Sequence, residues 1–188
     1  MTNGFINTLV AFLIGGATLC FNFKAVDASG TLLYDGEGTI VTLGDSYRME
    51  TPQMLIVSDG STKGIYQKEI DEIVLQGVAA GGAASGVGAS GSGASGSPAA
   101  NSIQGIMDNP FAILRQAGDF YTVTTWKGGK KSISGAPGAL PDKIELRSKA
   151  GAVYTIGILS AKKENSLDAS SFVLDMDDYP TAVVTDLR

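Results

Sequence analysis

The sequence contains no histidine, and this absence removes several common kinds of active site. Histidine is the usual general base beside a serine or cysteine nucleophile, and the commonest protein ligand of transition metals. Cys20 is the single cysteine, which excludes an intramolecular disulfide and a cysteine-cluster metal site. The acidic pairs 71–72 and 177–178 have no partner set of catalytic residues. An enzyme is therefore the least favoured class of function, and we expect no cofactor and no metal.

Basic residues are also few and scattered. The 14 Lys and Arg residues are outnumbered by 19 Asp and Glu residues, which gives a formal net charge of -5. The densest basic group, Lys127, Lys130 and Lys131, surrounds a Gly-Gly pair that is typical of a hairpin turn. Because a nucleic-acid-binding surface needs a basic patch or stripe, we expect no nucleic-acid partner.

Long hydrophobic runs are lacking as well. The apolar run over residues 4–20 is too short to span a bilayer and is interrupted by Gly15 and Gly16. No Lys or Arg precedes it, in contrast to a secretory signal. It predicts a helix over residues 7–14 that ends at the two glycines. We expect a processed domain that is not membrane-spanning, whose signal peptide is absent from this sequence.

The sequence is rich in short strand-like segments separated by turn residues. Phe21 and Phe23 share one face of a strand predicted over residues 18–26. Turns are predicted at Asp35-Gly36, Gly44-Asp45 and Asp59-Gly60. Residues 70–76 fit a helix or a strand, and their β-branched residues favour the strand. The remaining predicted strands cover residues 31–35, 39–43, 46–51, 54–58, 63–67, 119–126, 130–134, 143–148, 153–161, 172–174 and 183–187.

Three further segments are not strand-like. Residues 77–101 are almost entirely Gly, Ala and Ser, which predicts a flexible linker; a phosphate-binding loop is rejected because no Gly-Lys-Ser/Thr follows. Residues 102–116 predict a helix capped by Asp108 or Asn109. A short helical turn is predicted over residues 167–171, with Asp168 as its cap.

These segments amount to about ten strands and two short helices in one domain over residues 1–188. Strands do not alternate with helices, so we expect a mainly β (α+β) fold with an antiparallel sheet. A twisted sheet of this size must curl, and it then encloses either a packed core or a cavity.

Seven short motifs stand out along the chain: Asp27–Gly30, Gly36–Gly38, Tyr47–Pro52, Val57–Gly60, Asn109–Leu114, Ala169–Leu174 and Tyr179–Arg188. Taken in their order and spacing, these motifs resemble the LolA family of periplasmic carriers of outer-membrane lipoproteins, in a form typical of Bacteroidetes-type bacteria. The resemblance implies a half-open β-barrel with short helices as a lid over an apolar cavity for lipoprotein acyl chains. It also implies a monomer in the periplasm that exchanges cargo with an inner-membrane extraction complex and an outer-membrane acceptor.

Binding acyl chains requires a dry and adaptable cavity rather than catalytic groups, because each methylene removed from water contributes roughly 0.8 kcal/mol. Met49 and Met54 suit such a lining since methionine is flexible and polarizable. For each candidate, ordinary core packing is the competing interpretation, and a lipid-binding, sensor or structural module without transport is the alternative function. The candidate lining residues are Phe21, Phe23, Ile40, Met49, Met54, Ile56, Phe111, Leu114, Trp126, Ile144, Leu146, Tyr154, Ile156 and Ile158.

Overall fold

A computed structural model describes residues 2–78, 121–126 and 140–188 of the protein. The described chain begins with one long helix, α1, over Thr2–Ile14, and the remainder is mostly β-strand. The strands are β1 Ala17–Val26, β2 Leu32–Leu43, β3 Ser46–Glu50, β4 Met54–Ser58, β5 Thr62–Gln67, β6 Glu72–Gly77, β7 Tyr121–Trp126, β8 Lys143–Ser148, β9 Val153–Lys163 and β10 Val183–Leu187. Two short 3-10 helices, η3 Ala169–Phe172 and η4 Met176–Asp178, lie between β9 and β10.

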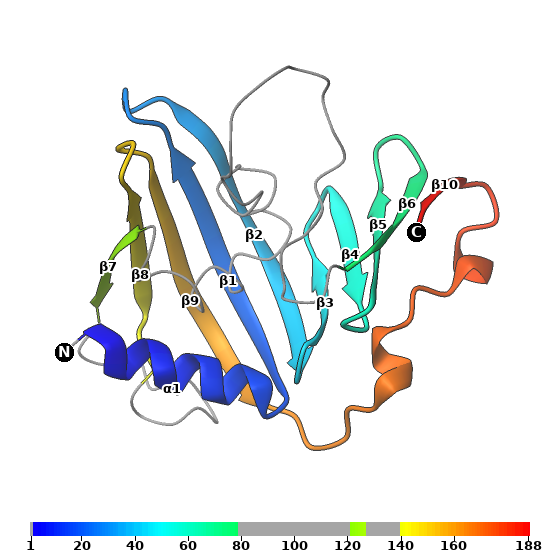
Figure 1. The fold of residues 1–188 in the computed structure, drawn as a ribbon, viewed down its shortest axis with the longest axis horizontal. Helices are drawn as coiled ribbons and strands as arrows, with labels where there is room; N and C mark the ends of the chain where they lie inside the picture. The colour runs from blue at the N-terminus through cyan, green and yellow to red at the C-terminus, as the bar shows by residue number, and fades with distance from the viewer. Residues whose placement is uncertain (1, 79–120, 127–139) are drawn as a thin grey trace.

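All these strands belong to one ten-stranded sheet. Its order is β10-β6-β5-β4-β3-β2-β1-β9-β8-β7, so most neighbours in space are also neighbours in sequence. The sheet curls and stays open, and α1 lies across one of its faces (Figure 1). We call the face that packs against α1 the inner face and the opposite one the outer face. The predicted mainly β fold with a curled sheet is confirmed.

Helix α1 ends at the glycine pair that the sequence indicated, although it begins at Thr2 rather than near residue 7. The Gly15 amide donates to the Ala11 carbonyl at 3.2 Å and the Gly16 amide to the Leu13 carbonyl at 3.1 Å. Gly16 has φ of 91°, in the region that favours glycine. This turn leads directly into β1, and the Gly16 carbonyl accepts from the Glu164 amide at 3.0 Å.

Strand β1 shows how alternation divides the two faces. Residues 17, 19, 21, 23 and 25 are buried, while those between them are more exposed. Because β1 lies between β2 and β9, its buried side chains form the centre of the inner face. They pack into one apolar cluster with Leu9 and Leu13 of α1. The predicted face carrying Phe21 and Phe23 is confirmed as a buried one.

One predicted turn is wrong. Asp35 and Gly36 lie inside the twelve-residue strand β2, paired with Lys24 and Phe23 of β1. The long partner strand supplies an uninterrupted ladder, and this pairing overrides the local turn preference of the Asp-Gly pair. The turns at Gly44-Asp45 and Asp59-Gly60 are as predicted, with Gly44 at φ of 60° and Gly60 at φ of 91°.

The sheet also departs from a purely antiparallel arrangement at one edge, where β10 pairs with β6 in parallel. The chain leaves β9, crosses to the far edge through η3 and η4, and enters beside β6 in the same direction (Figure 1). Phe172 ends η3, so the strand predicted over residues 172–174 does not form. Asp168 caps η3 as predicted. The linker beyond Val78, the helix predicted over residues 102–116 and the strand predicted over residues 130–134 lie outside the described residues.

Candidate functional site: an apolar pocket on the inner face

The structure brings most of the predicted lining residues together on the inner face. Ten of them are buried members of one apolar cluster, and Met54 packs against it half-buried. Phe111 and Leu114 lie outside the described residues, and of Trp126 only the backbone is described, paired with Lys143 at the end of β7. The ten buried residues are Phe21, Phe23, Ile40, Met49, Ile56, Ile144, Leu146, Tyr154, Ile156 and Ile158.

Helix α1 contributes side chains that the sequence interpretation did not include. Ile6, Leu9, Phe12 and Leu13 are buried in the same cluster. Their spacing of three and four residues is the helical signal that could have found them. The helix is held to the sheet by polar contacts too, since the buried Thr42 hydroxyl donates to the Leu13 carbonyl at 2.7 Å. This end of the inner face is therefore closed by packing.

A pocket opens farther along the inner face, over the middle of β1 to β4. Its empty space is about 300 Å³, with the open side included. Because part of this space is open to solvent, the pocket is a shallow hollow in the inner face rather than an enclosed cavity. The walls combine aromatic rings with two methionines, so the pocket is mainly apolar. Its lining residues are Phe21, Phe23, Tyr34, Gly36, Glu37, Met49, Thr51 and Met54.

Two glycines of β2 explain why this region is hollow. Gly36 and Gly38 occupy successive inner-face positions of β2, opposite Phe23 and Phe21 of β1. A Cβ added to Gly36 would lie 2.6 Å from the Tyr34 hydroxyl oxygen, and one added to Gly38 would lie 2.8 Å from the Glu50 carbonyl oxygen. Larger residues would thus fill or distort the pocket. Glycine within a strand is a known sign of such close approach, and it is the signal that sequence reasoning missed.

The ring of Phe23, which lines the pocket, packs between two other aromatic rings, that of Tyr34 in the lining and that of Tyr154 behind it. The Phe23 ring centroid lies 6.0 Å from that of Tyr34 and 6.4 Å from that of Tyr154. The planes of Phe23 and Tyr154 are almost parallel, at 4°. Burial raises the pKa of the Tyr34 phenol, and the nearby charge of Asp35 adds to this effect. The Tyr34 hydroxyl is therefore a protonated donor at neutral pH.

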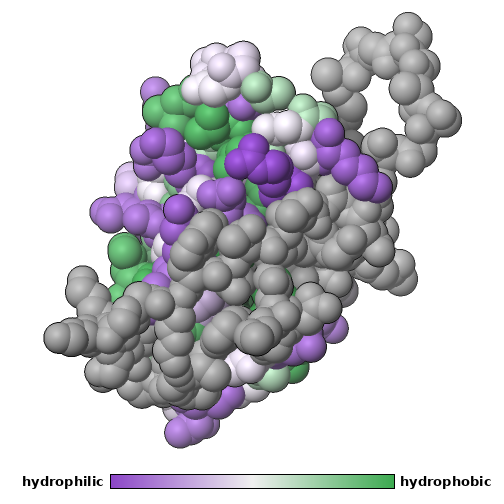
Figure 2. Space-filling view, turned by 90° about the vertical axis from the view of Figure 1, so that its left-hand side faces the viewer, coloured by the Kyte–Doolittle hydropathy of each residue, from purple (hydrophilic) through white to green (hydrophobic). Residues whose placement is uncertain are grey.

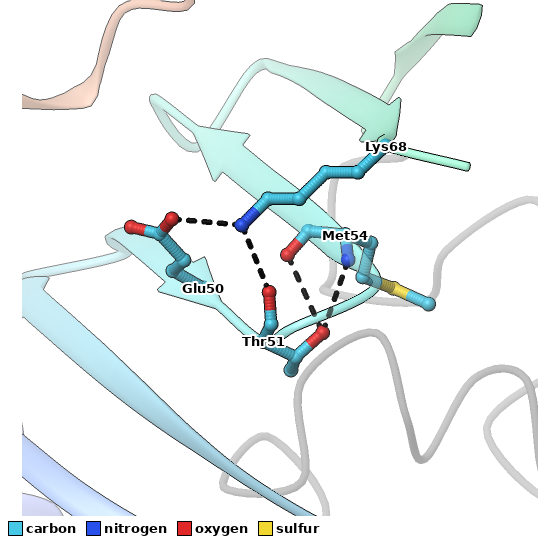
Figure 3. A network of polar contacts seen from close by, with 4 residues as sticks. All are labelled: Glu50, Thr51, Met54 and Lys68. Atoms are coloured by element: carbon cyan, nitrogen blue, oxygen red, sulfur yellow. Dashed lines mark hydrogen bonds and ion pairs between the residues drawn. The ribbon is translucent and has the colours of Figure 1, made fainter. Parts of the chain in front are cut away.

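A polar network fixes the loop between β3 and β4 at the pocket's edge (Figure 3). The Thr51 hydroxyl accepts from the Met54 amide at 3.1 Å and donates to the Met54 carbonyl at 3.4 Å. Lys68 Nζ donates to Glu50 Oε1 at 2.8 Å and to the Thr51 carbonyl at 3.0 Å. The hydrogen bond from Lys68 is the main cause that lowers the pKa of Glu50. Together these contacts hold Met54 beside the pocket.

The outer face of β2 to β5 is covered in part by the segment over residues 164–182, which we call the strap. Phe172 of the strap is buried against Leu55 and Val57 of β4. The rings of Tyr179 and Tyr66 lie 4.2 Å apart between centroids. A Cβ added to Gly64 would lie only 2.9 Å from Leu174 of the strap, so the contact is close.

Hydrogen bonds donated to Asp71 hold the far end of the strap. Its carboxylate accepts from the Tyr66 hydroxyl at 3.0 Å and from the Thr181 hydroxyl at 2.7 Å. The Asp71 carbonyl accepts from the Val183 amide at 2.9 Å, at the start of β10. Asp71 also has φ of 51°, unusual for a residue other than glycine. The outer face is thus closed by both packing and polar contacts.

The described residues offer neither a metal site nor a membrane-spanning helix. Within residues 2–78, 121–126 and 140–188, no group of three or more His, Cys, Asp or Glu side chains could hold a metal ion. No helix in the same ranges has the length and apolar character needed to cross a membrane. The surface seen in Figure 2 mixes hydrophilic with hydrophobic residues.

Comparisons with known proteins give distant likenesses in structure, but none in sequence. No protein-family model matches the sequence. No curated protein matches it either. Among solved structures, the chain is similar to the crystal structure of a LolA superfamily protein from Nitrosomonas europaea, with a TM-score of 0.45 and 10% sequence identity. The similarity covers 93% of this chain and 99% of that one. A likeness this distant does not establish a shared family.

Proposed function

We propose that the protein is a carrier that binds acyl chains in the inner-face pocket and ferries lipoproteins through the periplasm, from the inner to the outer membrane. The observation that supports this most directly is an open pocket walled by Phe21, Phe23, Met49 and Met54 on a sheet of otherwise buried apolar residues. A hydrocarbon chain is the ligand class that such walls favour, because its burial requires no polar partners. The cluster of inner-face candidates continues this apolar surface beyond the pocket on both sides.

The properties of the walls suit a carrier that must also release its cargo. Each methylene taken out of water contributes about 0.8 kcal/mol, so a few methylenes in the pocket give measurable affinity. Met49 and Met54 have unbranched, flexible side chains that adjust to different chain positions. The pocket is shallow and open on one side, so it accommodates part of a chain rather than a complete lipid anchor. We therefore expect binding in the micromolar range, exchangeable between membranes.

Binding is tested with the purified full chain and a fluorescent palmitate analogue. Met54→Glu places a charge at the half-buried edge of the pocket, and we expect it to weaken binding at least tenfold because the charge must be desolvated. Val173→Glu is the matched control, since Val173 is 58% exposed in the strap on the outer face. Native mass spectrometry of the purified protein checks for co-purified lipid. Equal binding by the wild type and Met54→Glu would show that the pocket is not the site.

Transport is tested separately by depleting the protein in cells of its source bacterium. A carrier predicts that lipoproteins accumulate at the inner membrane, which fractionation followed by immunoblotting measures. A lipid-binding sensor or structural module on the same fold predicts an unchanged distribution. An unchanged distribution would therefore exclude transport and support the alternative function. It would not affect the proposal of acyl-chain binding, which the palmitate experiment alone tests.

A further inference from the structure

The Tyr34 hydroxyl is a polar group in the pocket lining that has no role in binding a hydrocarbon chain. Phe21 and Phe23 are only 2% and 3% exposed, whereas Tyr34 is half-buried and marks the open side of the pocket together with Met54. The Tyr34 hydroxyl oxygen lies over Gly36, where a Cβ would be 2.6 Å away. The absence of a side chain at Gly36 thus allows this hydroxyl to reach the pocket. A phenylalanine would supply the same ring contact with Phe23 without a polar group.

The other polar groups of the lining are already engaged or cannot donate. The Thr51 hydroxyl is occupied by the Met54 amide and carbonyl. Glu37 is exposed on β2, and an ionised carboxylate only accepts hydrogen bonds. Within the described part of the chain, no hydrogen bond is formed by the Tyr34 hydroxyl. A half-buried phenol in such surroundings needs water or a ligand to complete its hydrogen bonding.

We propose that the Tyr34 hydroxyl is a specificity-determining donor that hydrogen-bonds the carbonyl oxygen of an acyl ester whose hydrocarbon chain lies against Phe21, Phe23, Met49 and Met54. This inference rests on the proposed acyl-chain binding and adds what the protein recognises besides hydrocarbon. The chain enters the apolar interior, and the carbonyl stays at the half-buried rim. An ester carbonyl accepts without donating, which matches a site whose free side-chain group is a donor. A tyrosine phenol is protonated at neutral pH and can donate, and burial raises the pKa of Tyr34 further.

The test compares two lipids that differ in the carbonyl alone. Monopalmitoyl glycerol carries an ester carbonyl, and its ether analogue, hexadecyl glycerol, has a methylene in the same place. We expect the wild type to bind the ester roughly 2- to 10-fold more tightly than the ether, as one net hydrogen bond provides. Tyr34→Phe should abolish this preference and leave the ether affinity unchanged. Tyr66→Phe is the control, because the Tyr66 hydroxyl donates to Asp71 on the outer face.

A spectroscopic measurement separates a direct contact from an indirect effect. With the ester carbonyl labelled with carbon-13, hydrogen bonding lowers its infrared stretching frequency, and this lowering should be lost in Tyr34→Phe and kept in Tyr66→Phe. Equal wild-type affinity for ester and ether, or an unchanged preference in Tyr34→Phe, would overturn the role of Tyr34 while acyl-chain binding stands. Failure of the wild type to bind either lipid would overturn both proposals. Thermal unfolding of each variant verifies that the fold is retained.

Discussion

Strand β4 is buried on both faces, and its two sides are closed in different ways. On the outer side, Leu55 and Val57 are covered by Phe172 of the strap, which Asp71 fastens by hydrogen bonds. On the inner side, Ile56 joins an apolar cluster next to an open pocket lined mainly by aromatic rings and two methionines. Directional contacts hold the outer side in one arrangement, while flexible side chains leave the inner side adaptable. The contrast assigns stability chiefly to the strap and ligand binding chiefly to the inner face.

The largest effect is expected from Phe172→Ala, which removes the buried centre of the outer cluster. Truncating a buried phenylalanine costs about 3–5 kcal/mol, so the free energy of unfolding in urea should fall by that amount. Palmitate binding should change less than twofold at temperatures where the variant is folded. Val173→Ala is the control, since Val173 is 58% exposed and its truncation should cost at most about 0.5 kcal/mol. If palmitate affinity fell in proportion to the free energy of unfolding, the outer face would contribute to binding as well as to stability. That result would contradict the assignment of binding to the inner face.

The next effect concerns the anchor of α1 on the inner face. Gly16→Ala introduces a Cβ that would lie 2.9 Å from the Glu164 carbonyl oxygen, at φ of 91°. We expect a loss of about 2–3 kcal/mol in unfolding free energy, from backbone strain plus the close contact. Gly30→Ala shares the positive φ, of 89°, but has nothing within 4 Å of its Cβ. It should therefore cost only about 1–2 kcal/mol. Equal losses in the two variants would mean that the contact with Glu164 is unimportant.

A smaller change in stability but a clear change in binding is expected from Gly36→Ala. The added methyl meets the end of the flexible Tyr34 side chain, at 2.6 Å from its hydroxyl oxygen, and this end can shift into the pocket. We expect unfolding free energy to change by less than about 1 kcal/mol and palmitate affinity to fall roughly tenfold. Gly77→Ala, with nothing near its Cβ, is the control. Unaltered affinity in Gly36→Ala would place the ligand elsewhere.

The smallest expected effect is a pH dependence in the local stability of β10, the strand at one edge of the sheet. Hydrogen bonds from Arg188 lower the pKa of Asp186 in β10 from 3.8 to about 2. A carboxyl group with a lowered folded-state pKa stabilises the fold fully above its unfolded pKa, and this contribution disappears as the pH falls through the folded pKa. Amide protection of β10 should therefore decrease between pH 3.8 and about 2. Asp186→Asn should remove that part of the pH dependence. If amide protection of β10 varied with pH in the same way in the variant and the wild type, the Asp186 carboxylate would not be its cause. The effect is small because both side chains are exposed.

Local signals in the sequence were sufficient for much of the fold. The end of α1 at Gly15 and Gly16, the turn at Asp59-Gly60 and the cap at Asp168 each depend on residues close together in the chain. Errors arose where a distant partner decides the outcome. The pairing of β2 with β1 converts Asp35-Gly36 into strand, and the parallel pairing of β10 with β6 depends on the path of the strap.

The candidate site was predictable to a similar extent. Alternation grouped residues that share one face of β1, β4, β8 and β9, because a period of two is visible in one strand at a time, but it did not show which face points inward. It did not indicate Tyr34, Gly36 or Gly38, whose contribution depends on what lies across the sheet and above it. A small residue such as Gly36 creates a hollow only if the residues around it in the folded sheet leave the space empty. A single sequence does not show which residues those are.

The central position of β1 has a consequence for how the chain folds. Strands β1 to β6 follow one another as neighbours, as do β7 to β9, so each group pairs locally along the chain. Among the described strands, only the β1–β9 ladder joins the two groups, and it pairs Ala17 with Lys163. Closing so long a stretch of chain is entropically costly and slows folding. Pairing of β1 with β9 should therefore be the late, rate-limiting step of folding. During synthesis on the ribosome, the inner face cannot be completed until β9 has been made.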